Sequence, residues 1–120
     1  MEDIKELTHA EEQVMQAIWR LGQGFAGEIV DAIAPPRPAY NTVLTVVRIL
    51  EKKGFVGHET FNKSNRYYPI VNKDDYSRML VNRLTHNYFN SSSRSLVSFL
   101  VDRKDISLQD LEMLTKELEQ

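Results

Sequence analysis

The chain has 120 residues, of which 42% are hydrophobic and 27% are charged, and its formal net charge is −2 at pH 7. This composition is ordinary for a globular protein and is sufficient for one domain or a small domain with an appendage, but not for a second large core. The lack of cysteine excludes disulfides, thiolate zinc sites and cysteine nucleophiles. The histidines His9, His58 and His86 lie in separate segments without metal-ligand spacing, so we expect neither a metal site nor a cofactor.

Targeting and catalytic signals are both missing from the sequence. No apolar run approaches the roughly 18 residues of a membrane span, and residues 1–6 lack the basic and apolar regions of a signal peptide. We therefore expect a cytoplasmic protein without direct membrane insertion. We also expect a protein that is not an enzyme, because there is no glycine-rich phosphate loop, metal-ligand spacing or nucleophile elbow.

Charge is distributed unevenly along the chain. Residues 37–73 contain seven Lys or Arg and two acids, whereas the segments on either side are net negative. Phosphate binding depends on a local basic face rather than on total charge, so this distribution is compatible with a nucleic-acid partner. A basic window of this size can also arise by chance. Charge alone therefore does not decide between a nucleic-acid partner and a chance distribution.

The first helix is predicted to begin at Thr8, because Thr8-His-Ala-Glu11 is a capping-box pattern. Apolar residues at helical spacing follow, and Gly22-Gln-Gly24 ends the helix. Phe25 is expected in a short strand or turn, before a second helix over residues 27–34. The apolar stripe of the first helix comprises Ala10, Val14, Ala17, Ile18 and Leu21.

A third helix is predicted over residues 39–53, after a connection stiffened by Pro35, Pro36 and Pro38. On a helical wheel its residues separate into an apolar side and a polar side that carries no carboxylate. Thr42 and Ile49 flank the polar side. Amide, hydroxyl, guanidinium and ammonium groups together offer hydrogen-bond donors and positive charge. The apolar side comprises Val43, Val46, Val47 and Leu50, and the polar side Asn41, Thr45, Arg48 and Lys52.

Two strands are predicted next, over residues 55–60 and 66–71, linked by a loop of hairpin length, Phe61-Asn-Lys-Ser-Asn65. Pro69 suggests that the second strand lies at an edge of its sheet. A helix with a polar, basic face followed by a basic hairpin resembles the DNA-reading part of a winged helix-turn-helix protein. The expected fold class is therefore mainly α with a small antiparallel β wing.

Residues 73–120 are predicted to form three helices, over residues 73–88, over residues 95–101 and from Ser107 onward. This piece is rich in large apolar residues but too small to bury them well by itself, so we expect it to pair with a second copy of the chain. The alternative is that it folds back on the N-terminal domain. The expected domains are thus a winged-helix DNA-binding domain, residues 1–72, and a helical dimerisation region, residues 73–120. The candidate dimer contacts are Tyr76, Leu80, Leu84, Leu96, Phe99, Leu111, Leu114 and Leu118.

Four segments, in order, resemble the penicillinase repressor family, the BlaI/MecI type of bacterial transcription regulator. Each motif alone is loose, but the four together at the expected spacing are specific and span nearly the whole chain. Leu7–Trp19 is similar to the family's opening helix, Thr42–Val56 to its recognition helix and the start of the wing, Arg66–Pro69 to the returning wing strand, and Phe89–Val97 with the final Leu-rich helix to its dimerisation region.

The resemblance implies a homodimeric transcriptional repressor that binds an inverted-repeat operator in double-stranded DNA. In antibiotic-resistance members of the family, a membrane-bound sensor with a metalloprotease domain responds to a β-lactam and triggers cleavage inside the dimerisation region, which releases the DNA. By resemblance, a membrane sensor-protease is a further expected partner of this chain. The corresponding bond would lie near Ser98–Phe99.

The polar side of the third helix supplies the expected base contacts, to which the resemblance adds Thr42. Asparagine can pair with adenine through two hydrogen bonds, and a threonine methyl can pack against the thymine methyl. There are three alternatives without DNA contact. The threonines could only cap the helix or fill its surface, and Lys52 and Lys53 could only interact with the helix dipole. The whole domain could also bind protein instead of DNA. The expected base contacts are Asn41, Thr42 and Thr45; Arg48 and Lys52 would hold phosphates or a flanking guanine, and Lys63 and Arg66 the DNA backbone beside the hairpin.

Overall fold

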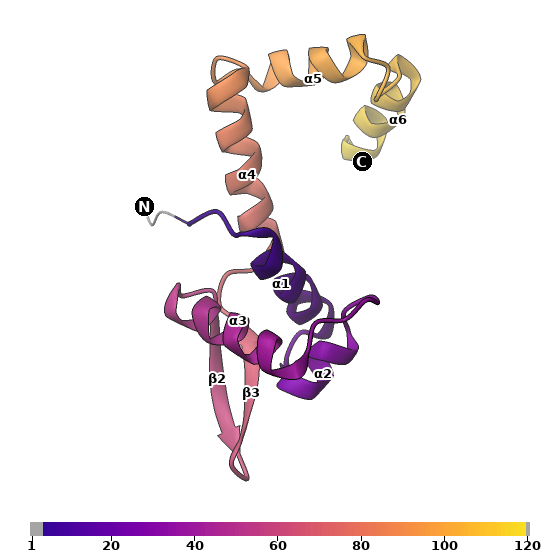
Figure 1. The fold of residues 1–120 in the computed structure, drawn as a ribbon. Coiled ribbons are helices and arrows are strands. Elements are labelled where there is room, and N and C mark those ends of the chain that lie inside the picture. The colour runs from indigo at the N-terminus through magenta and orange to yellow at the C-terminus, as the bar shows by residue number, and fades with distance from the viewer. Residues whose placement is uncertain (1–3, 120) are drawn as a thin grey trace. The chain divides into compact units, whose positions relative to one another are not determined.

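The computed structural model describes residues 4–119, which form a mainly helical chain with a small antiparallel sheet, as expected (Figure 1). The sheet has three strands, one more than the predicted hairpin. The described residues divide into two compact units: the head unit, which ends at Ser77, and the tail unit, which begins at Arg78. The first turn of α4 belongs to the head unit, because Tyr76 is buried in the core of that unit. The elements are α1 (His9–Leu21), β1 (Gly24–Phe25), α2 (Ala26–Asp31), α3 (Tyr40–Lys52), β2 (Val56–Phe61), β3 (Ser64–Pro69), α4 (Lys73–Tyr88), α5 (Ser93–Asp102) and α6 (Leu108–Leu118).

Helix α1 begins and ends where the sequence predicts. Glu11 N donates to Thr8 Oγ1 at 3.2 Å and Thr8 N donates to Glu11 Oε1 at 3.0 Å, which completes the capping box. The helix ends at Gly22, whose φ of 81° lies in the left-handed region that glycine adopts without steric cost. Local sequence signals therefore predict both ends of this helix correctly.

Helix α2 is shorter than predicted, ending at Asp31 instead of continuing to Ala34. Ala32 forms its C-cap, and the Ala32 N–H donates to the carbonyl oxygens of Glu28 and Ile29, both at 3.1 Å. A helical conformation at Ala34 would clash with the ring of Pro35, which disfavours a further turn. Ile33 is nevertheless buried, as predicted, although it lies beyond the helix.

The β2–β3 hairpin is tighter than the predicted five-residue loop. Phe61 pairs with Ser64, so β2 and β3 are joined by Asn62 and Lys63 alone. These two residues have φ values of 47° and 70°. A two-residue turn with both φ values positive has a twist that matches the right-handed twist of paired strands, and asparagine favours it. The predicted strand bounds, 55–60 and 66–71, were therefore wrong by one or two residues.

Strand β3 is the central strand of the sheet, and the edge position that Pro69 suggested was wrong. On one side β3 pairs with β2, and on the other it pairs with β1 through Gly24↔Tyr67 and Phe25↔Arg66. Pro69 is the last residue of β3, beyond the two residues that face β1. Its missing N–H therefore does not interrupt the pairing with β1.

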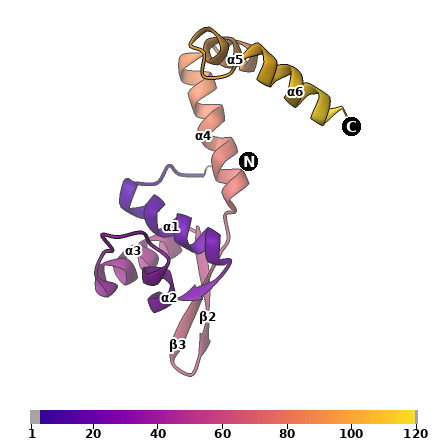
Figure 2. The same cartoon turned by 90° about the vertical axis from the view of Figure 1, so that its right-hand side faces the viewer.

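The core of the head unit lies among α1, α2, α3 and the base of the hairpin. The three helices pack together, while β2 and β3 extend beyond them as a hairpin (Figure 2). Burial of the apolar side of α3 leaves its polar side facing outward, as the wheel predicted. The fully buried side chains include Val14, Met15 and Ile18 of α1, Ile29 of α2, Val43, Val47 and Leu50 of α3, and Phe55 and Val56 before and in β2.

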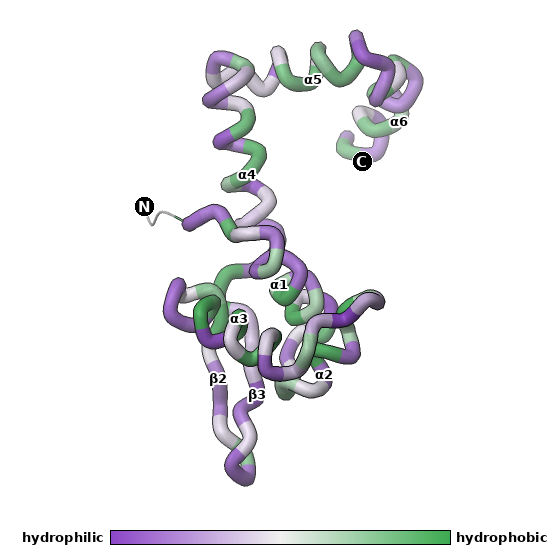
Figure 3. The backbone as a smooth tube through the Cα atoms, in the orientation of Figure 1, coloured by the Kyte–Doolittle hydropathy of each residue, from purple (hydrophilic) through white to green (hydrophobic). Residues whose placement is uncertain are grey.

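The tail unit contains the rest of α4, from Arg78 onward, together with α5 and α6. Helix α5 begins at Ser93 instead of the predicted Ser95, because the Ser92 hydroxyl accepts from Ser95 N at 3.1 Å and caps the helix earlier. Helix α6 follows the predicted acidic capping box of Ser107 and Asp110. The hydropathy colouring shows apolar bands alternating with polar ones along both helices (Figure 3). Both helices are therefore amphipathic.

Candidate nucleic-acid interface

Helix α3 presents every predicted polar residue of its outer side to solvent. Ala39 is the extended N-cap residue, and the helix begins at Tyr40. The opposite side is anchored by Val43, Val47 and Leu50, which are fully buried, so the helix cannot rotate about its axis without exposing them. The exposed residues are Asn41, Thr42, Thr45, Arg48 and Lys52.

Two exposed α3 side chains were not predicted as part of the interface. Tyr40, in the first turn, is 52% exposed, and Ile49 is 41% exposed. The wheel placed Ile49 beside the polar side, and this position was the signal that could have included it. For Tyr40 there was no comparable signal in the sequence. The outer side of α3 thus combines polar groups with two large apolar groups.

Thr45 makes a hydrogen bond inside its own helix. Its Oγ1 donates to the carbonyl oxygen of Asn41 at 2.9 Å. This bond uses the hydroxyl proton but leaves the threonine methyl and the Asn41 side-chain amide for other contacts. The Thr45 hydroxyl is therefore oriented toward the helix backbone, on the exposed side of α3.

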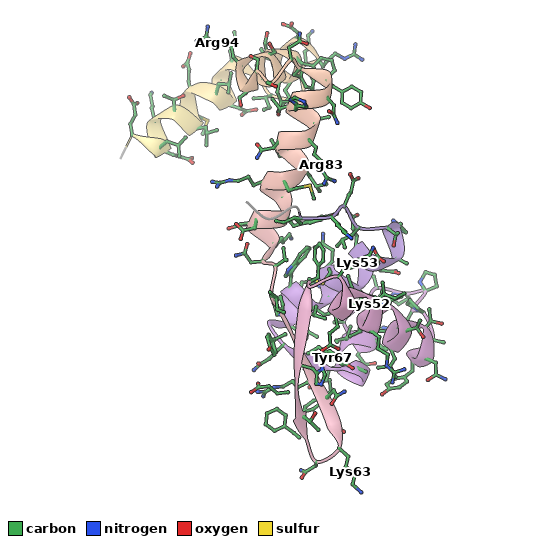
Figure 4. All side chains as sticks on the ribbon, turned by 90° about the vertical axis from the view of Figure 1, so that its left-hand side faces the viewer. Lys52, Lys53, Lys63, Tyr67, Arg83 and Arg94 are labelled. Atoms are coloured by element: carbon green, nitrogen blue, oxygen red, sulfur yellow. The ribbon has the colours of Figure 1, made fainter. Side chains whose placement is uncertain are left out.

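The hairpin places a positive charge at its tip, because Lys63 is the second residue of the two-residue turn and is exposed. Figure 4 shows Lys63 at this tip and Lys52 on α3. Both belong to the basic window of residues 37–73, so the head unit carries cations on the helix and on the hairpin.

Arg66 lies in β3 and has intramolecular partners that the sequence did not reveal. Its Nη2 lies 3.4 Å from Glu59 Oε1, and its guanidinium carbon lies 4.5 Å from the centroid of the Phe61 ring. Among the described residues, Arg66 Nε has no hydrogen-bond partner although it is buried. Register explains the ion pair, because Glu59 and Arg66 are directly opposite in the sheet. The expected contact of Arg66 with DNA backbone therefore competes with Glu59 and Phe61.

Lys53 connects α3 to α1. Its Nζ donates to Glu11 Oε1 at 2.8 Å and to Oε2 at 2.9 Å, and Glu11 is buried. Burial by itself raises the pKa of the Glu11 carboxyl, but Lys53 and the hydrogen bonds from Thr8 outweigh burial and hold this pKa below its ordinary value of 4.5. Lys53 thus forms an ion pair with α1, whereas Lys52 stays exposed.

Tyr76 was expected at a dimer contact, but it belongs to the core of the head unit and is 3% exposed. Its ring centroid lies 5.9 Å from that of Trp19 and 5.8 Å from that of Phe55. Its hydroxyl accepts from Leu7 N at 2.8 Å and donates to Glu12 Oε2 at 3.2 Å. Burial and the Glu12 carboxylate raise the pKa of Tyr76 above its ordinary value of 10.0, against the lowering effect of the Leu7 N–H. Tyr76 therefore cannot reach a second copy without leaving this core.

The other predicted dimer contacts lie on α4, α5 and α6 and keep substantial exposure within one chain. Leu118 is 77% exposed. Phe99 packs edge-on against Phe89, with ring centroids 5.4 Å apart, and is still exposed on its outer side. Ser98, beside it, is also exposed. The exposed predicted contacts are Leu84, Phe99, Leu114 and Leu118, and the half-buried ones are Leu80, Leu96 and Leu111.

Neither a membrane-spanning element nor a metal-ligand cluster was found in the part of the chain that the structure describes. None of its helices is both long and apolar enough to cross a bilayer. Residues 4–119 likewise contain no group of three or more His, Asp or Glu side chains arranged to hold a metal ion.

Known proteins resemble this chain over most of its length. The family model described as "Penicillinase repressor" matches residues 7–120. The methicillin resistance regulatory protein MecI of Mammaliicoccus sciuri is 29% identical over 110 residues, covering 91% of this chain and 89% of that protein. The penicillinase repressor of Bacillus licheniformis is 22% identical over 121 residues, covering 100% of this chain and 94% of that protein.

The solved structures include a similar fold. The solution structure of the DNA-binding domain of the repressor BlaI superposes with a TM-score of 0.54 at 26% sequence identity, covering 63% of this chain and 94% of that domain. Because the family model spans nearly all of the sequence, one conclusion follows: the chain belongs to the penicillinase repressor family.

Proposed function

We propose that this chain is a transcriptional repressor that binds double-stranded DNA through α3 and the β2–β3 hairpin. The observation that carries the proposal is the outer side of α3, where amide, hydroxyl and cationic groups are exposed together while the apolar side is buried. A helix with such a side fits the major groove, where each base pair presents a distinct pattern of donors and acceptors. The relatives support the same function, since BlaI is a repressor with a DNA-binding domain and MecI is a regulatory protein.

The proposed contacts divide into base readers and phosphate contacts. Asn41, Thr42 and Thr45 occupy the N-terminal half of α3 and are the proposed base readers. Arg48 and Lys52, further along the helix, hold phosphates or a flanking guanine, and Lys63 holds the backbone beside the hairpin tip. Arg66 joins them only when its guanidinium exchanges Glu59 for a phosphate.

A homodimer is the second part of the proposal. Helices α5 and α6 contain no buried residue within the described single chain, although both carry large apolar side chains. When the apolar surface of one copy packs against the same surface of a second copy, both surfaces are removed from water. Two head units held in this way would bind an inverted repeat, with half-site centres about 10 bp apart or a multiple of that distance.

Release from DNA is proposed to occur by cleavage near Ser98–Phe99, after a membrane sensor-protease has responded to a signal such as a β-lactam. Both residues are exposed on α5. Proteases bind extended segments, so cleavage requires local opening of α5, and a helix with few buried contacts opens at low cost. Cutting α5 would separate α6 from the rest of the chain and weaken the dimer.

A binding titration tests the central claim. The full chain is titrated with the DNA upstream of its own gene and with random DNA of equal length, each at two salt concentrations. We expect tighter binding to the upstream DNA at both concentrations and weaker binding to both DNAs at higher salt. Equal affinity for the two DNAs would refute sequence-specific repression, and a tight protein partner without salt-dependent DNA binding would favour a protein-interaction module.

A further inference from the structure

Ile49 is a large aliphatic side chain on the outer side of α3, and it is 41% exposed. Single exposed apolar residues are common on protein surfaces and by themselves need no explanation. Ile49, however, follows Thr42 and Thr45 at spacings of three and four residues, so the three side chains line one strip of the helix. The strip therefore contains two of the proposed base readers, Thr42 and Thr45, and continues one turn further to Ile49.

The hydrogen bond of Thr45 makes this strip more apolar than its composition suggests. The Thr45 hydroxyl is turned back to the Asn41 carbonyl oxygen, at 2.9 Å. Since the methyl occupies the other branch at Cβ, the methyl is the group left for contacts outside the helix. Thr45 and Ile49, one turn apart, thus offer adjacent aliphatic groups.

The one carboxylate of α3 is held away from this strip. Glu51 Oε2 lies 2.6 Å from His58 Nδ1 of β2, on the side of the helix that faces the hairpin. The outer side of α3 can therefore approach DNA without bringing an acid against phosphate. Its aliphatic strip would enter the same groove as Asn41 and Arg48.

We infer that Ile49, together with the Thr45 methyl, reads the C5-methyl groups of thymine in the major groove, an inference that rests on the proposed DNA binding. Among the four bases, only thymine presents a methyl group in this groove, so this apolar group marks A·T and T·A pairs. Removing one methyl group from water corresponds to about a fourfold change in a binding constant. Ile49 is thus a specificity-determining residue that acts without a hydrogen bond.

The test uses DNA that the full chain itself selects from a randomised pool. Each thymine of the selected half-site is replaced in turn by deoxyuridine, which removes the methyl and leaves every hydrogen-bonding group in place. The unmodified chain, Ile49→Ala, Ile49→Val and Leu21→Ala are titrated against the set. Leu21, at the end of α1, is the matched control because it is also 41% exposed.

For the unmodified chain, we expect about a fourfold loss of affinity on deoxyuridine at one or two thymines of each half-site. At the thymine that Ile49 contacts, the affinity of Ile49→Ala should no longer depend on the thymine methyl. Ile49→Val should show part of the fourfold loss on deoxyuridine, and Leu21→Ala should show all of it. The salt dependence is the same for Ile49→Ala as for the unmodified chain, because no charge is removed. Thermal melting of each variant verifies that it is folded.

Three results would overturn the inference while leaving DNA binding intact. In the first, the selected half-site contains no thymine. In the second, deoxyuridine leaves the affinity of the unmodified chain unchanged at every position. In the third, Ile49→Ala loses as much affinity on deoxyuridine as the unmodified chain does. Failure of the proposed function has a different signature. In that case the pool yields no preferred sequence, and the role of Ile49 fails with it.

Discussion

Lys53 Nζ lies 2.8 Å from Glu11 Oε1, which ties the C-terminal end of α3 to the first turn of α1. Glu11 also accepts the backbone N–H of Thr8 in the capping box. One buried carboxylate therefore serves both the start of α1 and the position of the proposed DNA-reading helix. Because Glu11 is buried, removal of Lys53 would leave its charge without its strongest partner.

Replacing Lys53 by Met should lower the free energy of unfolding by about 1 to 3 kcal/mol, because a hydrogen-bonded charge on Glu11 loses its partner. Methionine keeps most of the length of the side chain, so the effect reports mainly on the ion pair. Lys52→Met, at the exposed neighbouring position, is the control and should change stability by no more than about 0.5 kcal/mol. Urea denaturation measures both variants. Similar values for the two would show that the ion pair does not stabilise the fold.

The lowered pKa of Glu11 predicts how stability depends on pH. A carboxyl whose pKa is lower in the folded state stabilises the fold above its ordinary value of 4.5, and this stabilisation is lost as pH falls through the folded-state pKa. Glu11→Gln lacks this titration. The stability difference between the unmodified chain and Glu11→Gln should therefore be largest near neutral pH and shrink below about pH 4.5. Denaturation at a series of pH values from 7 to 3 measures it, and a difference that grows on acidification would contradict the assignment.

Glu59→Gln should tighten binding to all DNA sequences. Glu59 competes with phosphate for Arg66, and its own negative charge opposes the approach of the hairpin to DNA. Without the Glu59 carboxylate, Arg66 can contact one more phosphate. The plot of the logarithm of the DNA-binding constant against the logarithm of salt concentration should therefore become steeper by about one phosphate contact. Glu117→Gln, an exposed acid in α6, is the matched control for the loss of one negative charge. Equal effects of the two substitutions would mean that only net charge matters and that Arg66 does not reach DNA.

Leu118→Asp should convert a dimer into monomers without unfolding the head unit, because Leu118 is 77% exposed in the single chain and lies in the last turn of α6. A buried carboxylate in the dimer contact would be left without a partner, which is costly. Analytical ultracentrifugation measures the change. Gln109→Asp, at an exposed polar position of α6, should stay dimeric. If Leu118→Asp is as dimeric as the unmodified chain, α6 does not form the contact proposed here.

Local signals predicted much of the fold, and contacts between distant segments explain what was missed. The Thr8–Glu11 capping box, the amphipathic α3 and the bounds of α4 follow from residues near one another in sequence. The Lys53–Glu11 pair and the burial of Tyr76 join residues far apart in sequence, which helical periodicity cannot reveal. The central position of β3 depends on pairing with β1, a strand of two residues that carries almost no sequence signal.

The residues of the candidate site also divide into those that local sequence predicts and those that depend on contacts between distant segments. The exposed residues of α3 were predictable because burial of one side of a helix determines which side is outward. The partners of Arg66 were not predictable, because they depend on strand register. Glu59 lies directly opposite Arg66 in β2, and a loop of different length would place another residue opposite Arg66. The two-residue turn at Asn62 therefore determines both the place of Lys63 and the partner of Arg66.

Thr45→Ala and Lys63→Ala should separate base reading from phosphate binding. Thr45→Ala removes a proposed base contact, so it should cost about 1 to 3 kcal/mol on the selected operator and little on random DNA. Lys63→Ala removes a charge at the hairpin tip, so it should weaken binding to both DNAs and flatten the salt dependence by about one contact. Titration of each variant against both DNAs at several salt concentrations measures these effects. Equal losses on both DNAs for Thr45→Ala would remove Thr45 from the base readers, because a residue that senses sequence must discriminate between them.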